Sequence, residues 1–191
     1  MATVHSFTLG GVADTTLGMQ LIRTYTDDPL PATVDRTLMI PGRQGMVDFG
    51  ADLGARKFVL VCEAIGGTNP TTLTAILRAV SDVLLDSDGR PVDCSLVFTK
   101  EPARTYTVRY SGRLPLQRHG AGAGLLSIPL TAADPYAYGS TVTTAATVTA
   151  DGQEIAVTNS GGYATPPRIR IRNDGAGDIT GFTLTFSALK T

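Results

Sequence analysis

The sequence contains no tryptophan, only two histidines and two cysteines, and charged residues make up just 17% of its 191 residues. Its formal net charge is −1, so no overall electrostatic attraction draws the chain to nucleic acid or to an anionic membrane. No apolar run approaches the roughly 20 residues that a membrane-spanning helix needs. The first residues have neither a basic head nor an apolar core, so we expect no secretory signal. These shortages favour a soluble globular protein that neither reads nucleic acid nor inserts into membranes.

The same scarcity argues against catalysis and against bound metals or cofactors. His5 stands near the chain start and His119 in an Arg-His-Gly segment, and neither has a metal-ligand spacing to another residue. The Asp-Phe-Gly tripeptide at 48–50 lacks the catalytic-loop motif that accompanies it in protein kinases. The glycine-rich segment 120–124 lacks the Lys-Ser/Thr of a phosphate-binding loop. We therefore predict no catalytic residue, no metal site and no cofactor, and expect that the protein is not an enzyme.

The two cysteines, Cys62 and Cys94, both lie within apolar, strand-like runs. A disulfide framework needs more cysteines in a shorter chain, and a zinc site needs nearby ligands. We predict that both are small buried side chains. A bridge between them or a reactive thiol is the alternative.

What the sequence has in quantity is turn formers, 21 glycines and 11 prolines. They separate short apolar-rich runs that have the pattern of antiparallel strands. These runs cover residues 6–9, 19–25, 33–40, 56–65, 92–98, 105–110 and 126–130. The run 56–65 has apolar residues on both parities, which indicates a central strand.

One amphipathic helix is predicted over about residues 70–86. Its apolar stripe is formed by Leu73, Ile76, Leu77, Val80 and Leu84. Asn69 can cap it and Pro70 suits the first helical position, while the Asp-rich segment 86–89 ends it. Such a helix must lie on a sheet. The predicted fold is mainly β, an antiparallel β-sandwich or partly open barrel with one covering α-helix.

A change of composition divides the chain near residues 135–140. We assign residues 1–138 to an N-terminal β-sandwich domain and residues 139–191 to a small C-terminal all-β module, with strands expected at 154–158, 168–172 and 182–189. Fifty-odd residues are few for an independent core. The module is therefore expected to rest on the first domain or on neighbouring chains, or to continue in a longer parent protein.

Three arginines in that module alternate with isoleucines. In a strand, Arg168, Arg170 and Arg172 (the arginine triplet) line one face, and Ile169 and Ile171 the other. One interpretation is a solvated outer face above buried isoleucines. The other is an interchain contact or an anionic ligand, because guanidinium groups pair well with carboxylates.

A glycine-punctuated run between two strands is the most distinctive segment. It consists of Ile40, Pro41, Gly42, Arg43, Gln44, Gly45, Met46, Val47, Asp48, Phe49 and Gly50. Its glycines suit an extended arm whose apolar side chains (Ile40, Met46, Val47 and Phe49) reach a neighbouring subunit. A hairpin folded back within its own chain is the alternative.

Three short motifs occur in a characteristic order across about the first 140 residues. They are Pro-Gly-Arg-x-Gly at 41–45, an Arg-x-Tyr-x-x-Arg-Tyr-x-Gly stretch at 104–112 after the helix, and Asp-Pro-Tyr at 134–136. In this order they resemble the distal tail protein family of long-tailed bacteriophages with flexible tails.

That resemblance implies a structural virion protein that forms a hexameric ring at the distal tip of a non-contractile tail. The ring joins the tail tube to the adsorption apparatus or baseplate hub, and DNA passes through its channel. The implied partners are identical copies, the tail tube protein, the tape-measure protein, the tail hub or tail-associated protein, and receptor-binding proteins. The implied location is the phage tail tip, after synthesis in the host cytoplasm. The family's second domain is galectin-like or OB-like, and here it would be abbreviated.

Two other functions remain open at this stage. The first is a carbohydrate-binding module that aids host attachment, with Tyr136, Tyr138 and Tyr163 as the aromatic candidates in a chain without tryptophan. The second is another ring-forming protein similar to a tail tube subunit. A closed six-fold ring would support the tail-tip function, and a saccharide-binding monomer would refute it.

Overall fold

The computed structural model describes residues 6–24, 30–65 and 69–185. Within these residues the chain forms ten strands and one helix. In chain order they are β1 (Phe7–Leu9), β2 (Val12–Ala13), β3 (Met19–Thr24), β4 (Thr33–Leu38), β5 (Val47–Leu53), β6 (Arg56–Ile65), α1 (Pro70–Leu84), β7 (Asp93–Phe98), β8 (Thr105–Tyr110), β9 (Leu116–Arg118) and β10 (Ala123–Ala132). The chain divides into two compact units, Met1–Val142 and Thr143–Thr191.

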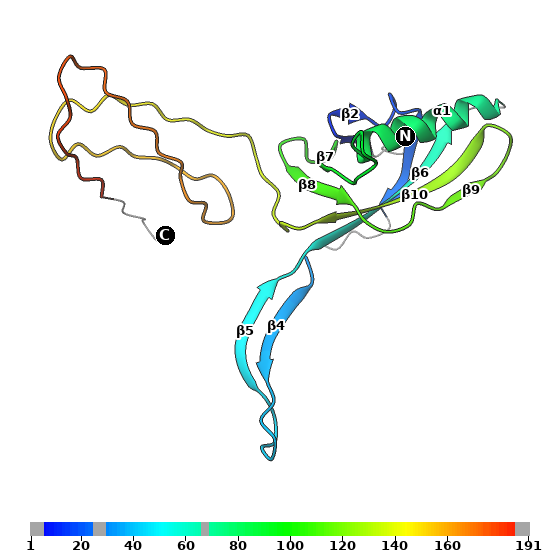
Figure 1. Cartoon of the computed structure of the whole chain (residues 1–191), viewed down its shortest axis with the longest axis horizontal. Helices are drawn as coiled ribbons and strands as arrows, with labels where there is room; N and C mark the ends of the chain where they lie inside the picture. The colour runs from blue at the N-terminus through cyan, green and yellow to red at the C-terminus, as the bar shows by residue number, and fades with distance from the viewer. Residues whose placement is uncertain (1–5, 25–29, 66–68, 186–191) are drawn as a thin grey trace. The chain divides into compact units, whose positions relative to one another are not determined.

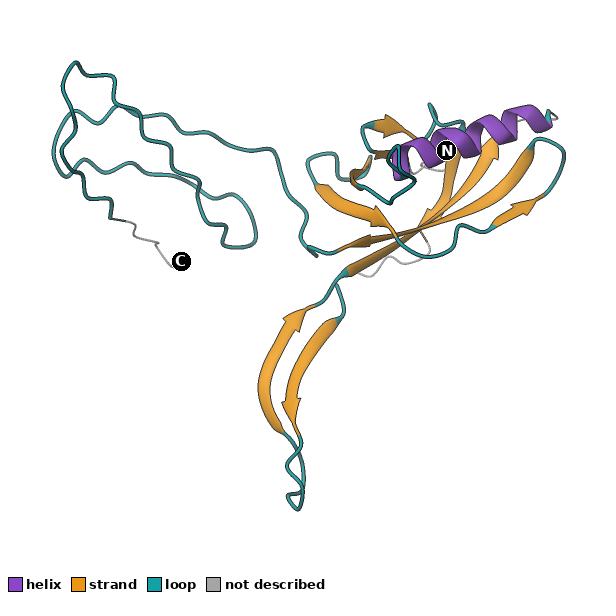
Figure 2. Ribbon diagram, in the orientation of Figure 1, coloured by secondary structure: helices purple, strands orange, loops and turns teal. Residues whose placement is uncertain are grey.

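The first unit is built on one curled antiparallel sheet with α1 lying along it (Figure 2). The strand order is β2-β1-β7-β8-β10-β6-β3, and β9 also pairs with β10. The two halves of the sheet meet where β8 pairs with β10 over only two residue pairs, Leu130 with Tyr110 and Thr131 with Arg109. The predicted mainly β, antiparallel fold with one helix is confirmed, and the expected two layers are parts of one sheet that curls over its core.

The longest ladder joins β6 to β10. Their pairing runs from Arg56 opposite Ala132 to Ile65 opposite Ala123, and β3 pairs with the other side of β6. The predicted central position of β6 is therefore correct. In β10 every second residue is buried, as the alternation of Leu126, Ile128 and Leu130 requires for a strand with one face on the core.

The helix α1 begins and packs as the sequence predicts. The Asn69 side chain accepts a hydrogen bond from the Thr71 N–H at 2.9 Å, and Pro70 is the first helical residue. Leu73, Ile76, Val80 and Leu84 are buried. The helix ends at Leu84, two residues before the predicted end, where Leu85 adopts an extended conformation.

The core lies between the two halves of the sheet and α1. Phe58 of β6 packs edge-on against Tyr106 of β8, with ring centroids 5.0 Å apart, and also contacts Phe98 of β7 at 6.1 Å. These contacts close one half of the sheet onto the other. The one buried charged residue among those described is Asp14, whose carboxylate accepts hydrogen bonds from the Ser6 hydroxyl at 2.7 Å and the Thr15 N–H at 2.8 Å.

The cysteines carry free thiols. Cys62 is fully buried, which confirms its prediction, whereas Cys94 is partly exposed. Burial, followed by the nearby charge of Asp14, raises the pKa of the Cys62 thiol to about 12. Burial and Asp93 also raise the pKa of Cys94.

The strands at the two ends of the strand order, β2 and β3, are short or irregular. At one edge β2 contains only Val12 and Ala13. At the other edge, the register of β3 against β6 shifts between Leu21 and Arg23, so that Ile22 is a bulge residue.

The second unit differs from its prediction. None of the residues 143–185 is assigned to a strand, so the strands expected at 154–158 and 168–172 are wrong, and the one expected at 182–189 lies partly outside the described residues. The physical reason is the absence of a covering layer: the apolar side chains that would line these strands, such as Ile155, Val157 and Ile169, are all exposed. The hydrogen bonds found there are local, for example from the Asn159 amide to the Tyr163 carbonyl at 2.8 Å. The predicted boundary at residue 138 lies shortly before the division at Val142.

Candidate functional site, a projecting hairpin arm

The segment singled out in the sequence belongs to a β-hairpin that projects from the first unit (Figure 1). Strands β4 and β5 form a two-stranded sheet of their own, separate from the large sheet. Thr33 pairs with Leu53 at the base, and Leu38 pairs with Val47 next to the connecting turn. We call residues 33–53 the arm and its connecting residues 39–46 the tip.

Glycines shape the arm at the points where the backbone needs a positive φ. Gly42 and Gly45 have φ of +82° and +84° in the tip, and Gly50 has +93° within β5. The register shifts between Asp35 and Thr37, so Phe49 and Gly50 together lie opposite one residue of β4. The Asp48 carboxylate accepts a hydrogen bond from the Gly50 N–H at 2.8 Å and stabilises this bulge.

The register gives the arm two unlike sides. Paired residues of an antiparallel ladder share a face, and successive residues alternate. Val34, Leu38, Val47 and Phe49 therefore lie on one side together with the ion-paired Arg36 and Asp52, and we call this the apolar side of the arm. The opposite side carries Thr33, Asp35, Thr37, Asp48, Ala51 and Leu53.

The arm leaves its large apolar side chains in solvent. The exposed fraction is 65% for Phe49 and 57% for Val34 on the apolar side. At the tip it is 78% for Met39 and 63% for Met46. Several large apolar side chains exposed on one element make the arm a candidate for a surface that a partner covers.

Several polar groups of the arm are paired within the arm. Arg36 forms an ion pair with Asp52 across the two strands, and both side chains are exposed. The turn is closed by a hydrogen bond from the Arg43 N–H to the Ile40 carbonyl at 3.1 Å. The arm therefore offers shape and apolar surface for a contact, with no convergent set of groups for a reaction.

All the predicted arm residues lie in this hairpin: Ile40, Pro41, Gly42, Arg43, Gly45 and Met46 in the tip, and Val47, Phe49 and Gly50 in β5. The sequence reasoning missed the partner strand's share, Val34, Leu38 and Met39. The alternation of Val34 and Leu38 with the polar residues Thr33, Asp35 and Thr37 was the signal that could have found it.

The arginine triplet is exposed, and so are the isoleucines between its members. Ile169 and Ile171 are 52% and 53% exposed, so the interpretation of a polar face above buried isoleucines is wrong. Arg172 pairs with Asp174 at 2.6 Å, with both side chains largely in solvent. A contact role for the triplet stays a prediction.

The Asp-Pro-Tyr motif follows β10 and forms a turn held by hydrogen bonds to the Asp134 carboxylate. The Tyr138 hydroxyl donates to the Asp134 carboxylate at 2.6 Å, and the Tyr136 N–H donates to its other oxygen at 3.1 Å. The backbones of Tyr138 and Thr105 exchange two hydrogen bonds of 2.8 Å. The hydrogen bond to Asp134 raises the pKa of the Tyr138 hydroxyl, because only the protonated phenol can donate it. Tyr163, the third aromatic candidate for sugar binding, belongs to the other unit.

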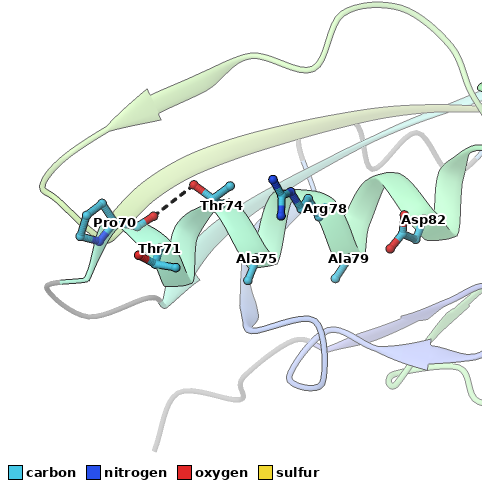
Figure 3. A pocket seen from close by; sticks show the side chains of 7 residues that line it. All are labelled: Pro70, Thr71, Thr74, Ala75, Arg78, Ala79 and Asp82. Carbon is cyan, nitrogen blue, oxygen red and sulfur yellow. Dashed lines mark hydrogen bonds between the residues drawn. The ribbon is translucent and has the colours of Figure 1, made fainter.

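Elsewhere the described residues offer little for chemistry. A shallow depression on the outer side of α1 is lined by Pro70, Thr71, Thr74, Ala75, Arg78, Ala79 and Asp82 (Figure 3). There the Thr74 hydroxyl is already bonded to the Pro70 carbonyl at 3.2 Å.

His119 is exposed, and His5 lies outside the described residues. Among the described residues, no group of three or more His, Cys, Asp or Glu side chains could hold a metal ion. None of the helices in that part is both long and apolar enough to cross a membrane.

Comparison with known proteins finds matches among solved structures. No protein-family model matches the sequence, and no curated protein matches it. Among solved structures, the chain is similar to the SPP1 Dit (gp 19.1) protein, which is described as a paradigm of the hub adsorption apparatus in phages that infect Gram-positive bacteria. The TM-score is 0.61 at 22% sequence identity, and the match covers 74% of this chain and 55% of that one. The chain therefore spans about half the length of that protein and shares its fold, as the resemblance to the distal tail proteins implied.

Proposed function

We propose that the protein is a structural subunit of a bacteriophage tail, a distal tail protein that forms a ring at the distal end of a long non-contractile tail. In this role it joins the tail tube to the adsorption hub. The observation that carries the proposal is the arm, whose apolar side and tip are exposed on a domain with the fold of SPP1 Dit.

The arm suits a ring because it is a surface that needs a different surface on the next copy. A contact between two unlike patches of identical chains is heterologous, and such contacts generate closed rings when the rotation between subunits closes. Each subunit then presents one arm and receives one. The hexameric number comes from the resemblance alone.

The remaining partners follow from the same role. They are the tail tube protein, the tape-measure protein, the tail hub protein and receptor-binding proteins, with DNA in transit through the ring. The arginine triplet is a second candidate contact, either between subunits or with an anionic partner surface. We assign the protein to the virion tail tip and give it no enzymatic activity.

Negative-stain imaging and light scattering of the purified full chain test the proposal. We expect closed rings with six-fold symmetry at high protein concentration. A protein that stays monomeric at all concentrations and binds saccharide would refute the ring and favour the carbohydrate-binding function.

A further inference from the structure

The arm is joined to the large sheet by a very short connection. The last hydrogen bond of the arm runs from the Gly54 N–H to the Ala32 carbonyl at 2.7 Å, just beyond the pair Thr33–Leu53. The large sheet begins at Arg56, which already pairs with Ala132. Ala55 alone lies between the two, so on this side the direction of the arm depends on the backbone at one residue.

The first side chain after this joint is held by aromatic rings. The Arg56 guanidinium carbon lies 5.3 Å from the centroid of Phe58 and 5.0 Å from that of Tyr106, and an Nη atom donates to the Tyr106 hydroxyl at 3.3 Å. Both rings belong to the core, because Phe58 and Tyr106 are only 5% and 6% exposed. A planar guanidinium over aromatic faces is a directional contact that a flexible ammonium reproduces poorly.

The neighbouring backbone leaves little freedom on the arm side of the joint. A Cβ at Gly54 would lie 3.0 Å from the Ala32 carbonyl oxygen, so the two backbone segments at the base of the arm are in close contact. The base of the arm is thus tightly closed on one side of Ala55, and Arg56 is fixed to the core on the other.

We propose that Arg56 is a positioning residue that fixes the direction of the arm relative to the large sheet. This inference rests on the proposed function for its biological purpose, because a ring closes only when every subunit presents its arm at the same angle. The structural part concerns a single subunit and stands on the contacts of Arg56.

Distances between spin labels in the monomer measure the direction of the arm. Thr37→Cys on the polar side of the arm and Thr107→Cys on the outer face of β8 place one label on each part, in a Cys94→Ala background. The measurement is made below the concentration at which the chain assembles. We expect one narrow distance distribution for the parent and a broad or multiple one for Arg56→Ala.

Lys100→Ala is the matched control. The Lys100 ammonium lies 5.8 Å from the Phe98 ring of the same aromatic cluster but is remote in sequence from the joint. This control should keep the narrow distribution, and Arg56→Lys should broaden it to an intermediate degree. Arg56→Lys keeps the charge and most of the side-chain length, so its spin-label distances can be measured even if Arg56→Ala fails to fold.

The expected effect on assembly is a rise of about tenfold in the concentration for half-assembly of Arg56→Ala, the size that loss of one directional cation–π contact allows. Unchanged distances in both Arg56 variants, a broad distribution in the parent, or equal broadening in the Lys100 control would each overturn the proposal. If the parent never assembles but its distances still depend on Arg56, the ring is refuted and the positioning role stands.

Discussion

Phe49→Ala tests whether the arm is an intersubunit contact. The Phe49 side chain is 65% exposed in the isolated chain, so most of its apolar surface is still available for burial. Full burial of a phenylalanine contributes roughly 1.5–3 kcal/mol, and the exposed two thirds therefore contribute about 1–2 kcal/mol to each contact. We expect the variant to need about 5–30 times more protein for half-assembly, because a closed ring has as many contacts as subunits.

The same substitution should hardly affect the folding of the subunit. A side chain that makes few contacts in its own chain changes stability by within about 0.5 kcal/mol when it is replaced. Sedimentation velocity over a concentration series measures assembly, and thermal unfolding followed by circular dichroism measures stability.

Phe182→Ala is the matched control for this experiment. Phe182 is 67% exposed, close to the value for Phe49, but belongs to the second unit. It receives the same chemical change outside the arm, so it should leave assembly unchanged. Equal loss of assembly in both variants, or a fall in melting temperature that accounts for the loss in Phe49→Ala, would refute the arm as the contact.

Three further outcomes are expected. Gly45→Val should weaken assembly more than it lowers the melting temperature, because it strains a positive-φ residue at the tip. The same change at Gly89 (φ +75°), which lies outside the arm, should leave assembly intact. An equal loss of assembly in the two variants would contradict this prediction. The Cys62 thiol should resist iodoacetamide at pH 8 until the protein unfolds. Folding raises the pKa of this thiol from 9.0 to about 12, so its contribution to the free energy of unfolding should be complete below pH 9 and disappear between pH 9 and 12. Urea unfolding at several pH values measures this. Replacing the arginine triplet with alanine should weaken assembly without changing the melting temperature, and light scattering identical to the parent's would leave the triplet as ordinary solvated surface.

The fold of the first unit was predictable because its strands and helix each bury one regular stripe. In β10 the alternation of Leu126, Ile128 and Leu130 fixes both the element and the face that it buries, and the helical spacing of Leu73, Ile76 and Val80 does the same for α1. In both elements local periodicity and tertiary burial agree.

The parts that were missed are those where stability comes from pairing alone. Strand β5 contains Asp48, Gly50 and Asp52, which have low strand propensity, and it is formed by its ladder with β4 and by a bulge. A strand of that composition gives no signal by itself. The separation of the arm from the sheet was equally hidden, because the sequence does not show which strands share a sheet.

The second unit shows the opposite error. Alternation around Ile155 and Ile169 states which side chains would share a face if a strand formed. It does not supply the layer that would cover that face, and these side chains are exposed. For the candidate site, the glycines and apolar residues of the tip were predictable, while the apolar side of the arm required the register of β4 against β5.

The irregular ends of the large sheet bear on how the first unit avoids pairing with strands of other chains. An exposed, regular edge strand is a template on which other chains add strands and aggregate. Here one edge offers only the two residues of β2, and the bulge at Ile22 interrupts the other. Both edges are therefore poor templates for the open-ended stacking of chains. For the proposed ring subunit, this would leave the arm, and not the edges of the large sheet, as the part of the first unit that meets another copy.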